Sequence, residues 1–296
     1  QCQFVRGGPP YVRKEMEEIR EILARNNFYF KKKFGQNFLT DPNLLGAIVR
    51  DAGVDEKTTV LEIGAGAGAL TRALSAAAGK VLAYEIDASL RPVLAQTLAG
   101  CENVEVAFGD FLRADLRAIE AELGHYRVVA NLPYYVTTPV MMRFLEEASC
   151  CDGVTVMVQE EVADRFTAQA GTPEYGAVTA AIALRGEARI VRRVPRTMFT
   201  PRPNVDSAVV RIDFEQDRIP VRSVGAYRAV VRCAFSGRRK TLENNLMNTF
   251  RLSREQAKEM LSEAGIADMA RGETLTPAQF ARLADVLTEH RCTDGQ

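Results

Sequence analysis

The sequence predicts an α/β fold, in which helices cover both faces of a mostly parallel β-sheet and a smaller all-helical C-terminal domain follows. Between residues 58 and 159, short apolar segments alternate with segments of helical periodicity. Beyond about residue 217, every periodic segment is helical. Because strands that alternate with helices are joined by right-handed crossovers, we expect them to form a parallel sheet.

Three parts are expected along the chain: an irregular N-terminal arm at 1–13, the α/β domain at 14–216 and the helical domain at 217–296. In the α/β domain a first amphipathic helix is predicted at 14–25, and a second begins after Asp41, which caps it, with Pro42 in its first position. Strands are then predicted at 58–64, 80–87, 103–110, 127–133, 153–159 and 205–214. Further helices are predicted at 67–77, 89–99, 139–148, 227–236, 239–250, 253–265 and 276–290.

The composition is that of a soluble globular protein. The chain has 296 residues, of which 47% are hydrophobic and 26% charged, enough for one large or two ordinary domains. No apolar run approaches the roughly 18 residues that a membrane span needs, and no basic-then-apolar leader opens the sequence. The six cysteines form no CxxC pair and only two histidines are present, so no metal site is expected. We expect a cytoplasmic monomer with reduced thiols and no membrane partner.

Charge is unevenly distributed along the chain although the net charge is zero. Residues 185–251 contain 15 Lys and Arg against 6 Asp and Glu. Such a segment can present a basic face to a nucleic acid. Charges scattered over a solvated surface are the alternative, because clustering along the sequence does not guarantee a patch in space.

A glycine loop joins the strand at 58–64 to the following helix. Gly64, Gly66 and Gly68 let the backbone turn sharply and bring a ligand against main-chain N–H groups. The pattern is GxGxG and not the GxGxxG of dinucleotide binders, and no P-loop lysine follows.

Acidic residues end the next two strands. Glu85 lies about 20 residues beyond the glycine loop, where a carboxylate can accept hydrogen bonds from both ribose hydroxyls. Asp110 ends the third strand, where it can accept a hydrogen bond from an adenine amino group. The set fits an adenosyl ligand without phosphates, S-adenosylmethionine, whereas either acid alone is explained equally well as an ordinary polar residue at a strand end.

Eight motifs occur across both predicted domains: GQNFL, LEIGAGAGALT, YEID, GDFL, NLPYYVTTP, FTPRPNVDSAVV, AFSGRRKTLENNL and LTPAQFARLADVL. Together they resemble the motifs of the KsgA (RsmA) family of small-subunit ribosomal RNA adenine dimethyltransferases. The resemblance covers roughly residues 18–290. NLPY is shared with the Erm large-subunit rRNA methyltransferases, whereas RRKTL and PNVDSAVV favour KsgA.

The resemblance implies a Rossmann-like class I methyltransferase domain that uses S-adenosylmethionine. It implies transfer of methyl groups to N6 of two adjacent adenosines near the 3′ end of small-subunit rRNA, within an immature ribosomal subunit. Asn37 and Leu39 would cover the cofactor, and Phe199 would stack on the target base, although a buried loop anchor explains Phe199 equally well. The residues lining the cofactor site would be Gly64, Gly66, Glu85, Asp110 and Asn131.

The turn at 131–139 suits an adenine amine, which is a weak nucleophile because its lone pair is delocalised. The Asn131 side-chain oxygen and the Leu132 carbonyl could accept both N–H hydrogens, and Pro133 biases Leu132 towards an extended conformation. Tyr134 could stack on the base. We expect these four residues to act by positioning and electrostatics, with no strong general base.

Three basic residues, Arg238, Arg239 and Lys240, are predicted to open a helix of the C-terminal domain. Cations at a helix start are mildly unfavourable, which suggests that they contact RNA phosphates and not their own helix; a solvated helix end is the alternative.

Three other functions remain open. An Erm-like enzyme would act on large-subunit rRNA, and an assembly factor would depend mainly on RNA binding. A small-molecule methyltransferase would not need the basic helical appendage.

Overall fold

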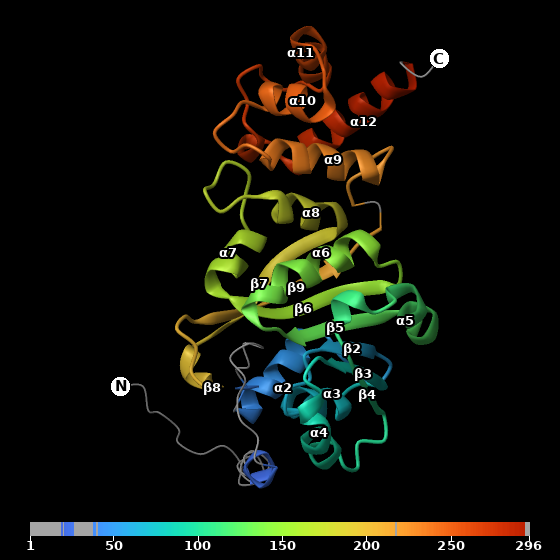
Figure 1. The fold of residues 1–296 in the computed structure, drawn as a ribbon, viewed down its shortest axis with the longest axis vertical. Helices are drawn as coiled ribbons and strands as arrows, with labels where there is room; N and C mark the ends of the chain where they lie inside the picture. Colours follow the sequence, from blue (N-terminus) through green and yellow to red (C-terminus); the bar gives the residue numbers. More distant parts are fainter. Residues whose placement is uncertain (1–18, 20, 27–37, 40, 217, 294–296) are drawn as a thin grey trace. The chain divides into compact units, whose positions relative to one another are not determined.

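The computed structural model describes residues 19, 21–26, 38, 39, 41–216 and 218–293 (Figure 1). The predicted arm at 1–13 and the site residue Asn37 lie outside these residues. Contacts divide the chain into two compact units, Gln1–Ala163 with Arg189–Ile212, and Asp164–Ala188 with Asp213–Gln296. The second unit therefore takes in a segment from within the range 14–216, which was predicted as the α/β domain.

A seven-stranded sheet in the order β4-β3-β2-β5-β6-β9-β7 is the centre of the fold. Each neighbouring pair from β4 to β6 is parallel, and β2 lies between β3 and β5 in the middle of this parallel part. The strands are β2 (Thr59–Ile63), β3 (Lys80–Glu85), β4 (Val104–Phe108), β5 (Tyr126–Asn131), β6 (Cys151–Gln159), β7 (Gly186–Val194) and β9 (Ser207–Phe214). The predicted α/β fold is confirmed.

Helices connect the parallel strands. Asp41 caps α2 by accepting a hydrogen bond from the Leu44 N–H at 3.0 Å, and Pro42 opens the helix, as predicted. Residues 21–25, inside the first predicted helix, are also helical. The helices between parallel strands are α3 (Ala69–Ser75), α4 (Arg91–Thr97), α5 (Leu116–Leu123) and α6 (Thr137–Glu147). α2 (Pro42–Asp51) precedes β2, and α7 (Glu160–Phe166) follows β6.

The strand β7 and the helices α5, α7 and α8 were not predicted from the sequence. β7 lies at the edge of the sheet, where only one side pairs with another strand, and its sequence GEARIVRRV carries three arginines. An edge strand of this composition lacks the apolar run that marks a central strand.

The helical unit has its own hydrophobic core. Tyr227 and Phe280 are fully buried there, and the Tyr227 hydroxyl donates a hydrogen bond to the Ala180 carbonyl at 2.9 Å. Side-chain caps start three of its helices, at Ser223, Thr241 and Ser253. The helices are α8 (Ala177–Arg185), α9 (Val224–Phe235), α10 (Leu242–Phe250), α11 (Arg254–Glu263) and α12 (Pro277–Thr293).

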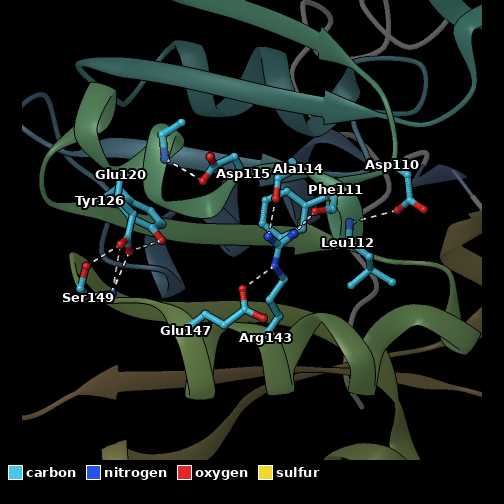
Figure 2. Close-up of polar contacts among 11 residues, drawn as sticks. Asp110, Phe111, Leu112, Ala114, Asp115, Glu120, Tyr126, Arg143, Glu147 and Ser149 are labelled. Atoms are coloured by element: carbon cyan, nitrogen blue, oxygen red, sulfur yellow. Dashed lines mark hydrogen bonds and ion pairs between the residues drawn. The ribbon is translucent and has the colours of Figure 1, made fainter.

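A buried carboxylate, Glu120 on α5, fastens this helix to the start of β6 (Figure 2). It accepts hydrogen bonds from the Ser149 N–H and hydroxyl, from the Cys150 N–H and from the Tyr126 hydroxyl. Burial raises the pKa of Glu120, but these hydrogen bonds together hold the pKa below its usual value. Glu120 is thus a satisfied structural ion.

Glu62, in the middle of β2, is a buried carboxyl of the opposite kind. Its side chain is 0% exposed and makes no hydrogen bond of normal geometry with a described residue. Burial raises the pKa of Glu62 to about 8, while the nearby Thr71 hydroxyl lowers it and the Glu85 charge raises it by smaller amounts. Glu62 is therefore mostly protonated at neutral pH.

The raised pKa of Glu62 predicts a pH-dependent stability. In the unfolded chain Glu62 ionises near pH 4.5, whereas in the folded protein it keeps its proton up to about pH 8. Between these values the unfolded state binds fewer protons than the folded state. As the pH rises, the free energy of unfolding therefore falls by about 1 kcal/mol per pH unit. Urea unfolding between pH 5 and 8 should show that E62Q lacks this fall. The exposed Glu56 supplies the control E56Q, which should retain it; parallel curves for E62Q and the parent would contradict the assignment.

Candidate functional site

A cavity of about 400 Å³ lies at the carboxyl ends of β2, β3, β4 and β5. Its volume is within the range of sites for small ligands. Because the carboxyl ends of parallel strands meet at one edge of a sheet, the loops after these strands form its wall. The predicted site residues that line it are Leu39, Gly64, Gly66, Glu85, Asp110, Asn131, Leu132, Pro133, Tyr134 and Phe199.

The glycine loop after β2 has the backbone that its sequence predicts. Gly64 and Gly66 have φ values of +85° and +56°, which L side chains rarely adopt. A Cβ atom on Gly66 would lie 3.0 Å from the Phe38 ring, and one on Gly64 would lie 3.3 Å from the Asn131 carbonyl oxygen. At both positions a side chain would therefore crowd a residue that itself lines the cavity.

Glu85 joins the end of β3 to the glycine loop. Its Oε2 accepts a hydrogen bond from the Gly66 N–H at 2.7 Å, and its Oε1 accepts one from the Asp87 N–H at 2.8 Å. Burial raises the pKa of Glu85, and the N–H groups of Asp87, Gly66 and Ile86 oppose that rise. A carboxylate has about four acceptor positions, so two hydrogen bonds leave others for a ligand.

Asp110 follows β4 and caps the short 3₁₀ helix η3 (Phe111–Arg113). Its Oδ1 accepts a hydrogen bond from the Leu112 N–H at 3.0 Å (Figure 2). Its Oδ2 lies 3.6 Å from the Arg113 Nε. The residue thus has a local structural role as well as a place in the cavity wall. A hydrogen bond from Asp110 to an adenine amino group stays a prediction.

The turn after β5 is held by its own backbone and by Ser207. Pro133 has φ −55° and ψ 136°, and its carbonyl accepts a hydrogen bond from the Val136 N–H at 3.1 Å in the 3₁₀ helix η4 (Tyr134–Val136). The half-buried Tyr134 places its hydroxyl 3.1 Å from the Ser207 Oγ. Burial raises the pKa of Tyr134, which keeps its phenol neutral.

Phe199 belongs to a two-stranded sheet that was not predicted. In this sheet β1 (Phe38–Leu39) pairs antiparallel with β8 (Phe199–Thr200), and Leu39 is the partner of Phe199. Phe199 is 5% exposed and packs in a core cluster with Leu45 and Val209, yet it also lines the cavity. It is therefore both a buried anchor and part of the wall. Strands of two residues have no periodicity by which a sequence could reveal them.

Some cavity residues were missed although they adjoin the predicted ones. Tyr135 is 59% exposed beside Tyr134, and Ile86 and Leu112 are exposed apolar residues next to the two acids. Their position beside the motif residues was the only available signal.

The basic triplet of the helical unit precedes its helix and does not open it, which corrects the prediction. Arg238, Arg239 and Lys240 form an exposed turn between α9 and α10, and Thr241 is the residue that caps α10. The Arg238 guanidinium donates a hydrogen bond to the Tyr175 carbonyl at 3.2 Å. Cations in this turn lie outside the first turn of α10, so an unfavourable interaction with the helix dipole no longer indicates that they bind phosphates.

Several other arginines of the basic segment pair with acids of their own unit. Arg192 lies 2.7 Å from Asp51, Arg193 forms an ion pair with Glu160, and Arg196 lies 3.7 Å from Asp206; these contacts neutralise part of the charge surplus. In the described part of the chain, no group of His, Cys, Asp and Glu side chains could hold a metal ion. None of the described helices has the length and apolarity to cross a membrane.

Comparison with known proteins gives one family. The family model described as ribosomal RNA adenine dimethylase matches residues 27–289. A relative from Geobacillus thermodenitrificans, named ribosomal RNA small subunit methyltransferase A, is 48% identical over 276 residues, which cover 90% of this chain and 94% of the relative. The protein of the same name from Enterococcus faecalis is 43% identical, covering 92% of this chain and 95% of its own.

Two solved structures share the fold. The 23S rRNA methyltransferase ErmE has a TM-score of 0.67 and 29% identity, and the match covers 85% of this chain and all of ErmE. A dimethyladenosine transferase from Plasmodium falciparum has a TM-score of 0.73 at 23% identity, with 87% and 98% of the two chains covered. The methyltransferase fold, with helices in its C-terminal region, is thus shown independently of the sequence motifs.

The contact that a side chain on Gly66 would make with Phe38 predicts weaker binding of S-adenosylmethionine, the ligand expected from the sequence. G66A adds a Cβ against the Phe38 ring at a positive φ, so we expect a stability loss of about 1–2 kcal/mol and S-adenosylmethionine binding weakened by about tenfold. G100A is the control, because Gly100 has φ +87° with nothing within 4 Å of its added Cβ. Titration calorimetry should show unchanged binding for G100A. Parent-like binding by G66A would show that this loop does not contact the cofactor.

Proposed function

Because the chain belongs to the ribosomal RNA adenine dimethylase family, we propose that it transfers methyl groups from S-adenosylmethionine to N6 of two adjacent adenosines in the 3′-terminal hairpin of small-subunit rRNA. The observation that carries the choice of subunit is the similarity to proteins named ribosomal RNA small subunit methyltransferase A. They reach 48% identity over 90% of the chain, against 29% for ErmE.

The cavity residues fit S-adenosylmethionine. Gly64 and Gly66 line the cavity without a side chain between it and the main chain, and the Glu85 carboxylate at its wall would accept hydrogen bonds from the ribose hydroxyls. Asp110 would accept a hydrogen bond from the adenine amino group, and Leu39 would cover the ligand. When bound, the cofactor supplies an electrophilic methyl group on a sulfonium.

The turn after β5 would hold the target adenine. The Asn131 side-chain oxygen and the Leu132 carbonyl would accept the two N–H hydrogens of the amine, which favours a pyramidal nitrogen with its lone pair directed at the methyl group. Tyr134, fixed through Ser207, and Phe199, fixed by its strand pairing, would enclose the base. The adenine must leave its own stack to enter such a site.

RNA docking by the helical unit is supported by its exposed basic turn. Arg239 and Lys240 are exposed, and Arg238 uses one N–H on the Tyr175 carbonyl while its side chain stays at the surface. Guanidinium and ammonium groups of this kind bind phosphates in a way that depends on shape and salt but not on sequence. We propose that the substrate RNA lies within an immature small subunit. We also propose that the protein is a monomer and that it acts in the cytoplasm.

Replacement of Asn131 separates catalysis from binding. N131A removes one acceptor of the amine, so we expect methyl transfer to fall by about 100-fold while RNA affinity stays within about threefold. N43A, an exposed asparagine on α2 away from the cavity, is the matched control and should keep full activity. Single-turnover transfer of labelled methyl groups gives the rate. A near-normal rate for N131A would contradict the assigned acceptor and would favour a role as an RNA-binding assembly factor.

The substrate itself is tested with unmodified ribosomal subunits. Small and large subunits that lack the modification are incubated separately with labelled S-adenosylmethionine, and the label is mapped to single nucleotides. We expect dimethylation of two adjacent adenosines near the 3′ end of the small-subunit RNA. Label found only in the large subunit would establish the Erm-like alternative.

A further inference from the structure

Arg143, on α6, is a largely enclosed cation outside the cavity wall, with a side chain that is 10% exposed. Its Nη1 donates to the Phe111 carbonyl and its Nη2 donates to the Ala114 carbonyl (Figure 2). Its Nε donates to the Glu147 Oε2 at 3.1 Å, one helical turn further along α6. The planar guanidinium thus bridges two carbonyls of the segment that follows Asp110, a task that a lysine ammonium performs poorly.

The ring of Phe111, in the same segment, also packs against residues of α6. The Arg143 Cζ lies 5.1 Å from the centroid of the Phe111 ring. Phe144, the next residue of α6, stacks on that ring at 5.4 Å with an interplanar angle of 21°. Tyr84, from β3, meets it edge-on at 5.4 Å. Phe111 is therefore fixed on several sides, and two of its contacts come from adjacent residues of one helix.

This contact fixes the acid that the cofactor's adenine would meet. Asp110 is bonded to the Leu112 N–H within the 3₁₀ turn, so its carboxylate follows the position of residues 111–114. Asp110, Phe111 and Leu112 all line the cavity, whereas Arg143 does not. In addition α6 begins at Thr137, directly after the turn that carries Asn131 and Tyr134. One helix therefore connects the two predicted base sites.

We propose that Arg143 is a positioning residue that sets the Asp110 carboxylate for recognition of the adenine amino group of the cofactor. This inference rests on the proposed cofactor site. Arg143 holds the two carbonyls of the η3 turn and covers the Phe111 ring, which keeps Asp110 oriented to accept a hydrogen bond. Without the guanidinium the turn shifts. The protein then loses its selectivity for a 6-amino purine, while its other contacts to the ligand are kept.

The test measures base selectivity and not only affinity. The probes are S-adenosylhomocysteine and S-inosylhomocysteine, in which an oxygen that accepts hydrogen bonds replaces the amino group that donates them. Calorimetry gives both dissociation constants for the parent and for R143M, R143K, E147Q and D110A. The parent should prefer the adenosyl ligand by about tenfold or more, since a lost hydrogen bond leaves the acceptor unpaired.

We expect R143M to weaken adenosyl binding by about tenfold and inosyl binding by less than about threefold. R143K should keep an intermediate preference, and it stands in for R143M if R143M does not fold. E147Q is the control: it removes the partner of Nε and leaves both carbonyl contacts, so the full preference should remain.

Equal weakening of both ligands by R143M, or by R143K in its place, would show a purely structural role and overturn the inference. Loss of preference in D110A with full preference in the Arg143 variants would overturn it too, while leaving the proposed cofactor site intact. If D110A itself keeps the preference, Asp110 is not the adenine acceptor, and the proposed site fails together with the role of Arg143.

Discussion

The hydrogen bond that the Gly66 N–H donates to the Glu85 carboxylate, at 2.7 Å, joins the loop after β2 to the end of β3. It exists because β2 and β3 are parallel neighbours, which brings their carboxyl ends to the same edge of the sheet. β5 lies on the other side of β2, so Asn131 reaches the same edge and its carbonyl oxygen limits what Gly64 can carry. The order of three strands therefore places Glu85, the glycine loop and the turn after Asn131 around one cavity.

The parallel part of the fold follows directly from the sequence. β2, β3 and β5 are buried strands of mostly apolar residues; Gly64 follows β2, and the polar residues Glu85 and Asn131 end β3 and β5. Because the carboxyl ends of neighbouring parallel strands lie at one edge, the proximity of Gly66, Glu85 and Asn131 can be predicted from the sequence alone. The Asp41 cap and Pro42 are local signals and are confirmed for the same reason.

What the sequence could not predict depends on contacts between distant residues. The pairing of Leu39 with Phe199 joins segments 160 residues apart through strands of two residues each. The arginines of β7 interrupt the apolar pattern by which a strand is recognised in a sequence. Two of them, Arg192 and Arg193, pair with Asp51 and Glu160. The contacts of Arg143 with carbonyls about 30 residues earlier have no sequence signal, since an arginine on a helix face is ordinarily a solvated residue. The basic turn before α10 was misplaced because Thr241, one residue later, is the better cap.

We propose that one edge of the sheet holds the methyl donor and the target adenine together, and a crystal structure of the protein with S-adenosylhomocysteine and adenosine monophosphate would show whether it does. We expect the ribose hydroxyls of the first ligand on Glu85, and N6 of the second at about 2.7–3.2 Å from both the Asn131 Oδ1 and the Leu132 carbonyl oxygen. A thioether bound away from the Gly64–Gly66 loop, or an N6 directed away from Asn131, would contradict it.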